Sequence, residues 1–150
     1  MDKPQTKRIL VVDDEECIAE TLVLILRSFG YEATARNDGR SALEECEIQA
    51  PDLVISDVMM PELNGIELAI QIEERYQACR ILLISGLGSS IALLEEASQT
   101  GHSFEIMSKP IRPADLLARI KAVLAEEKPS QIVKAPVTTR TFQTSTLSGI

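Results

Sequence analysis

The sequence predicts an α/β fold in which a doubly wound, five-stranded parallel sheet carries helices on both faces, a three-layer α/β/α arrangement. Strand-like apolar runs and helix-like amphipathic stretches alternate five times along the chain, and this pattern is typical of parallel sheets with helical crossovers. Right-handed crossovers leave few topologies open. Several apolar runs also end on a polar residue, and the carboxyl ends of parallel strands share one edge of the sheet. The fold class therefore also predicts where a functional site would lie.

The first predicted strand is Arg8–Asp13, an apolar run that ends on a carboxylate. A helix follows, because apolar residues recur at helical spacing and give one predicted apolar face: Ile18, Leu22, Ile25, Leu26 and Phe29. Gly30 stands where a glycine just past a helix end is favoured. Tyr31–Arg36 has the alternation and β-branching of a short, less buried strand.

A turn at residues 37–39 leads into a second helix, whose inner face is marked by Ala42, Leu43 and Cys46. The third strand, Leu53–Asp57, is the segment around which we expect the fold to be organised. Four residues that can be buried lead into one carboxylate, as in a strand covered on both faces. The chain then turns before Gly65, so Asp57 would stand at the edge of the sheet where a reactive group is held.

The second half of the chain continues the alternation. A third helix is marked by Leu68, Ala69, Ile72 and Tyr76. The strand Arg80–Ser85 leads into a glycine-rich loop at 86–90 and a weak helix at 91–99 that Gly101 ends. Phe104–Ser108 is a short fifth strand. The last helix begins near Pro113 and has an apolar stripe of Leu116, Leu117, Ile120, Val123 and Leu124.

Composition excludes several classes of protein. With 150 residues, 45% of them apolar and 25% charged, the chain is expected to form one globular domain. No apolar run reaches the roughly 18 residues of a membrane span, and the polar start does not resemble a signal peptide. We therefore expect a cytoplasmic protein. The three cysteines, Cys17, Cys46 and Cys79, are odd in number and lack CxxC spacing, so we expect buried, reduced thiols.

Charge is unevenly distributed along the chain. The first 127 residues hold 12 basic and 23 acidic side chains, a net charge of −11, whereas residues 128–150 hold no acid and carry +3. So acidic a body has no electrostatic reason to bind nucleic acid directly, and a divalent cation or a basic protein surface is a more natural partner. Residues 128–150 are rich in Ser and Thr without helical periodicity, so we expect a disordered polar tail.

Four predicted strands end on groups that can bind phosphate or metal, namely Asp13-Asp14, Asp57, Ser85 and Lys109. In a doubly wound sheet the strand order reverses between the first and third strands, and the three carboxylates would converge at the crevice that opens there. Their repulsion, roughly 4 kcal/mol for a pair about 4 Å apart, calls for a cation, and oxygen ligands favour Mg²⁺. Taken singly, these residues have ordinary alternatives: a helix cap for either aspartate of the pair, a turn for the serine, and an exposed charge for the lysine.

Four motifs in this order resemble the receiver domain of bacterial two-component response regulators: VVDDEE at 11–16, DVMMPELNG at 57–65, LISG at 83–86 and SKP at 108–110. The resemblance runs over residues 8–127, all of the expected folded body. It implies a flavodoxin-like sheet with strand order 2-1-3-4-5, and a signalling module without enzymatic activity of its own.

The resemblance also assigns roles to single residues. Asp57 would accept a phosphoryl group from the phosphohistidine of a sensor histidine kinase or a phosphotransfer protein. Mg²⁺ would be held by Asp13, Asp14 and Asp57 together with the backbone carbonyl of Met59. The phosphoryl group would be bound by Ser85, Gly86 and Lys109, and the Lys109–Pro110 bond is expected to be cis. Phosphorylation would change the surface at 86–110 and so control a downstream protein or relay the phosphate.

One departure from the family pattern concerns the switch. Receivers usually carry Tyr or Phe three residues before the lysine, where this chain has Ile106, and Phe104 is not an obvious replacement. Beside a stand-alone receiver, two alternatives remain open. A pseudo-receiver would bind a partner without phosphorylation. An aspartyl-phosphate phosphatase would place its nucleophile on the first strand in a D-x-D pattern and add a cap domain, and neither feature is found here.

Overall fold

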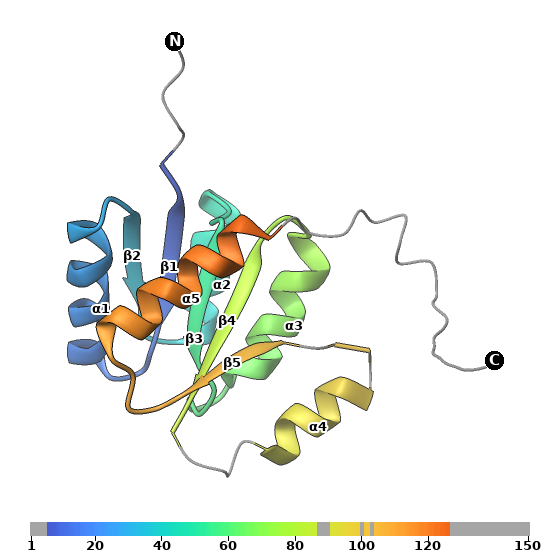
Figure 1. Cartoon of the computed structure of the whole chain (residues 1–150). Coiled ribbons are helices and arrows are strands. Elements are labelled where there is room, and N and C mark those ends of the chain that lie inside the picture. The colour runs from blue at the N-terminus through green and yellow to red at the C-terminus, as the bar shows by residue number, and fades with distance from the viewer. Residues whose placement is uncertain (1–5, 87–90, 100, 103, 127–150) are drawn as a thin grey trace, which may run out of the picture.

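The computed structural model describes residues 6–86, 91–99, 101–102 and 104–126. A five-stranded parallel sheet has the order β2-β1-β3-β4-β5, with helices on both faces (Figure 1), which confirms the predicted fold class and strand order. The strands are β1 (Arg8–Val12), β2 (Glu32–Arg36), β3 (Leu53–Asp57), β4 (Arg80–Ser85) and β5 (Glu105–Ser108). The helices are α1 (Glu16–Ser28), α2 (Gly39–Ile48), α3 (Gly65–Arg75), α4 (Ile91–Gln99) and α5 (Pro113–Ala125). None of the helices in these described segments combines the length and apolar content that crossing a membrane requires.

Two hydrophobic cores lie on opposite faces of the sheet, because alternate residues of each strand point to opposite sides. On one face α1 and α5 pack on the strands, and α5 crosses in front of the sheet in Figure 1. On the other face α2, α3 and the buried Ala97 of α4 pack on the alternate strand residues. β3 is buried along its whole length, from Leu53 to Asp57, as expected for a central strand covered on both sides.

Local sequence signals mark the helix ends. Gly30 follows α1 with φ of 95°, a conformation that favours glycine, and the N–H of Tyr31 bonds to the carbonyl of Leu26. Asp38 caps α2 by accepting a bond from the N–H of Ser41 at 2.7 Å. Pro113 begins α5 as predicted. The predicted glycine-rich loop and the predicted polar tail fall mostly outside the described residues.

The predicted apolar face of α1 is partly wrong. The buried residues are Ala19, Val23 and Leu26, whereas Ile18 and Phe29 are 37% and 61% exposed. Both sets recur at i, i+4 and i+7, so spacing alone cannot tell which of two adjacent stripes faces the sheet. The smaller stripe, which contains Ala19, packs against the strands.

The prediction for the cysteines also needs correction. Cys46 and Cys79 are buried free thiols as expected, but Cys17 is exposed. Cys17 lies in the first turn of α1, on the face of the helix that is exposed to solvent. Burial raises the pKa of the Cys46 thiol to about 11, so this side chain acts as a small apolar residue of the core.

Candidate functional site

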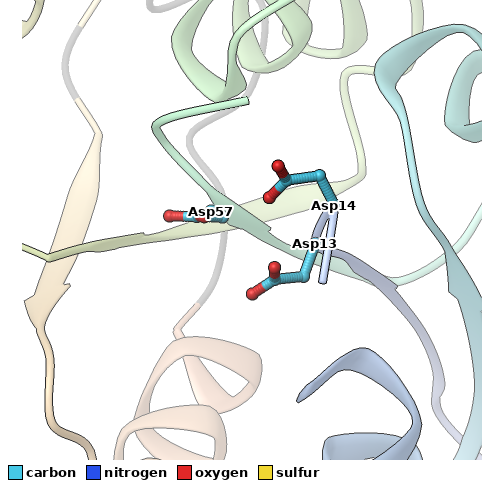
Figure 2. Close-up of side chains that lie close together, drawn as sticks. All are labelled: Asp13, Asp14 and Asp57. Carbon is cyan, nitrogen blue, oxygen red and sulfur yellow. The ribbon is translucent and has the colours of Figure 1, made fainter. Parts of the chain in front are cut away.

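Three aspartates meet at the carboxyl edge of the sheet. Asp13 and Asp14 directly follow β1, and Asp57 is the last residue of the neighbouring strand β3. Figure 2 shows their carboxylates pointing toward the same side, and one oxygen from each lies within 4.8 Å of the others. Asp13 and Asp57 are only 4% and 7% exposed, while Asp14 is exposed. The structure therefore brings together the three predicted metal ligands.

Lys109 reaches the same place from the end of β5. Its Nζ lies 3.6 Å from Oδ2 of Asp57 and 3.9 Å from Oδ2 of Asp13. Its backbone N–H donates to the carbonyl of Ser85 at 2.8 Å, and the Lys109–Pro110 peptide bond is cis. Ser85 is 6% exposed and is the last residue of β4. It follows Ile84, the residue that pairs with Asp57 in the sheet. A cation and a hydroxyl group therefore lie at the strand ends next to Asp57.

The backbone around Asp57 is held by close contacts that the sequence pattern does not predict. A Cβ atom on Gly65 would lie 2.1 Å from the carbonyl oxygen of Asp57, so only glycine fits at the start of α3. The N–H of Gly65 donates to the carbonyl of Val58 at 2.9 Å, and the hydroxyl of Ser56 donates to the carbonyl of Asp57 at 3.0 Å. In the sequence, Gly65 stands out as the last residue of the motif DVMMPELNG and as part of a turn, but neither feature predicts its contact with the carbonyl of Asp57.

The backbone of Asp13 is fixed in a similar way. The N–H of Asp13 donates to the carbonyl of Arg36 at 3.1 Å, and the carbonyl of Asp13 accepts a bond from Nδ2 of Asn37 at 2.9 Å. Its carboxylate accepts a bond from the N–H of Glu15 at 2.9 Å. Glu15 is the N-cap of α1, and no side chain caps that helix. The carboxylate of Asp13 therefore stabilises the turn before the helix and does not serve as the helix cap.

The electrostatics of the cluster follow from burial. Burial raises the pKa of Asp57, and the charge of Asp14 adds to the increase, while Lys109 and a backbone hydrogen bond from Met59 oppose it. The pKa of Asp13 is raised chiefly by burial and also by the charges of Asp57 and Asp14, against the Glu15 bond and Lys109. One lysine does not balance three carboxylates, so the ionised cluster is destabilising until a cation compensates it. Converging carboxylate oxygens fit a hard ion such as Mg²⁺.

The switch position remains without an aromatic side chain. Ile106 lies on β5 and is 36% exposed. Phe104 does not replace it, because its ring stacks on His102 with centroids 6.0 Å apart and packs against the core beneath α2 and α3. The roles of the Met59 carbonyl and of Gly86 as ligands stay predictions.

Comparison with known proteins agrees with this geometry. The family model described as the response regulator receiver domain matches residues 9–121. The chain is 36% identical over 118 residues to the alkaline phosphatase synthesis transcriptional regulatory protein PhoP of Bacillus subtilis, a match covering 79% of this chain and 48% of PhoP. It is 32% identical over 137 residues to the DNA-binding response regulator MtrA of Mycolicibacterium smegmatis, covering 85% of this chain and 55% of MtrA. The chain thus spans about half the length of the curated relatives it matches.

Solved structures give the same result. The chemotaxis protein CheY4 of Vibrio cholerae superposes with a TM-score of 0.69 at 30% identity, covering 79% of this chain and 99% of that protein. A CheY-like receiver domain protein of Methanospirillum hungatei gives a TM-score of 0.72 at 28% identity, covering 80% and 94%. Fold, acidic cluster and sequence agree, and the chain belongs to the response regulator receiver domain family.

Proposed function

We propose that this receiver is a signalling module controlled by phosphorylation at Asp57. The phosphoryl donor is the phosphohistidine of a sensor histidine kinase or a phosphotransfer protein, and the reaction needs Mg²⁺. One observation carries the proposal: a buried aspartate ends the central strand with a lysine Nζ at 3.6 Å and two further carboxylates beside it. A charged group held in this way at the edge of a parallel sheet is typical of a reactive site.

The chemistry follows from the arrangement of the side chains. A carboxylate oxygen of Asp57 attacks the phosphorus atom in line; the new P–O bond forms as the P–N bond breaks, and its electron pair stays on the histidine nitrogen. Lys109, already close to Asp57, would bind an oxygen of the transferred group and neutralise its charge. Asp13, Asp14 and Asp57, with the Met59 carbonyl as a further ligand, would hold Mg²⁺, which neutralises charge on the phosphoryl oxygens.

Phosphorylation is then reported through the strand that carries Ser85. The hydroxyl of Ser85 would bind the phosphoryl group, and the surface formed by residues 86–110 would change in response. The readout is the binding of a downstream protein or onward transfer of the phosphate, in the cytoplasm. The acidic composition of the body argues against direct contact with nucleic acid.

The test is incubation with acetyl phosphate and Mg²⁺, followed by intact-mass analysis. The wild type should gain the mass of one phosphoryl group, and Asp57→Asn should gain none. Asp52→Asn is a matched control, because Asp52 lies just before β3, binds the N–H of Arg8 and is not part of the acidic cluster. It should be phosphorylated like the wild type.

Three other outcomes would contradict the proposal. Equal phosphorylation of Asp57→Asn would place the phosphate elsewhere. A wild type that no donor or kinase phosphorylates would favour the pseudo-receiver. Sustained turnover of a phosphomonoester would favour the phosphatase.

A further inference from the structure

Asn37 links the loop after β2 to the acidic cluster. This half-buried residue precedes α2, and its Nδ2 donates a hydrogen bond to the backbone carbonyl of Asp13 at 2.9 Å. The N–H of Asp13 donates to the carbonyl of Arg36 at 3.1 Å. Arg36, the last residue of β2, and Asn37, which follows it, therefore hold both polar backbone groups of Asp13.

The bond from Asn37 has a consequence for Asp14. The carbonyl of Asp13 and the nitrogen of Asp14 belong to one planar peptide unit, so fixing the direction of that carbonyl fixes the direction in which Asp14 leaves the strand. Asp14 is exposed, and its carboxylate makes no hydrogen bond or ion pair with any residue that the structure describes. Its place beside Asp13 and Asp57 therefore depends on the backbone.

We infer that Asn37 is a positioning residue of the cation site, one that orients the Asp13–Asp14 peptide so that both carboxylates face Asp57. The inference rests on the proposed function, because it requires that the acidic cluster hold Mg²⁺. A neutral amide suits this task. It donates a hydrogen bond without adding negative charge to the cluster, and without the positive charge that would compete with the metal ion.

An ordinary role in capping α2 does not explain Asn37. The N-cap of α2 is Asp38, whose carboxylate accepts the bond from the N–H of Ser41 at 2.7 Å. The two neighbours thus divide their tasks: Asp38 stabilises the helix that follows, and Asn37 stabilises the strand end beside it. This division provides a matched control one residue away.

The experiment titrates Mg²⁺ alone into metal-free protein by calorimetry. Asn37→Leu keeps the branched shape and removes the donor, and we expect it to weaken Mg²⁺ binding by on the order of tenfold, as changes behind a metal ligand commonly do. Asp38→Ala should lower the melting temperature yet leave the Mg²⁺ Kd close to that of the wild type. If Asn37→Leu does not fold, Asn37→Ala replaces it.

A second measurement does not depend on the metal. In the metal-free protein, the ¹³C signal of the Asp13 carbonyl and the ¹⁵N signal of Asp14 should shift in Asn37→Leu, and they should stay in place in Asp38→Ala. The inference is overturned by an unchanged Kd, by unchanged signals, or by a wild type that does not bind Mg²⁺. A protein that binds Mg²⁺ but is never phosphorylated contradicts the proposed function alone, so the two failures can be told apart.

Discussion

Replacing Asp13 by Asn should stabilise the metal-free protein. The substitution keeps the shape of the side chain, and its Oδ1 can still accept the bond that the N–H of Glu15 donates at 2.9 Å. What it removes is one charge from a cluster of three. Two repulsions, with Asp14 and Asp57, are lost, together with one attraction to Nζ of Lys109 at 3.9 Å.

The magnitude follows from the distances. At an effective dielectric of about 20, two like charges cost about 3.5 kcal/mol at 4.8 Å, the upper limit of the separations in the cluster, and two opposite charges at 3.9 Å contribute about 4 kcal/mol. Two repulsions outweigh one attraction, and the burial of Asp13 adds to the cost. Solvent screens the exposed Asp14 and the partly exposed Lys109, so we expect a net stabilisation of about 1 to 3 kcal/mol.

The assay is thermal unfolding in a chelator, where Asp13→Asn should melt about 3 to 8 °C above the wild type. Glu95→Gln is the control, because it removes a negative charge from the exposed surface of α4 and should change little. Adding Mg²⁺ should reduce or reverse this difference in melting temperature, since a ligand at 100 times its Kd stabilises the wild type by about 2.7 kcal/mol and the variant binds Mg²⁺ more weakly. An Asp13→Asn variant that melts lower in chelator and binds Mg²⁺ normally would refute this reasoning.

Three further predictions follow from the same site. The pKa of Asp57 is raised in the folded protein. The contribution of Asp57 to stability is therefore greatest at a pH below the ordinary pKa of an aspartate, and it is lost as the pH rises through the raised pKa. The melting temperature of metal-free Asp57→Asn should therefore be close to that of the wild type at about pH 4 and higher than that of the wild type at about pH 7. The same difference in melting temperature at both pH values would contradict this prediction. Gly65→Ala should lower the free energy of unfolding by about 1 to 3 kcal/mol and reduce phosphorylation, because the Cβ of the alanine would meet the carbonyl of Asp57. Gly86→Ala, with open space around the added Cβ, is the control in denaturant unfolding. Ser85→Ala should still be phosphorylated but lose most of the change in hydrogen exchange that beryllofluoride, a stand-in for the phosphoryl group, causes in the following loop. Changes in hydrogen exchange that persist in Ser85→Ala and centre on Ile106 would exclude a switch that acts through Ser85.

The fold was predictable because its determinants are local and periodic. The burial of β3 follows from its run of apolar residues, and the ends of α1 and α5 follow from Gly30 and Pro113. Parallel strands share a carboxyl edge, so the convergence of Asp13 and Asp57 could be predicted without knowing any distance.

The rotation of α1 about its own axis could not be predicted from the sequence. Two adjacent stripes at the same spacing compete for the sheet, and only packing against the strands selects the one that contains Ala19 over the one that contains Ile18. The exposure of Cys17 follows from that choice. Periodicity measures the angle between residues on a helix, but it does not measure how the helix is rotated against its neighbours.

The amino-acid sequence by itself determined the fold class, the strand order through the family resemblance, and which residues form the candidate site. Only the tertiary structure decided how these residues are held. The approach of Gly65 to the carbonyl of Asp57 and the bond from Asn37 to the carbonyl of Asp13 join segments 8 and 24 residues apart in the chain. A residue that acts on the backbone of a distant strand leaves no periodic trace in its own segment, because its position is set by the packing of the sheet and loops around it.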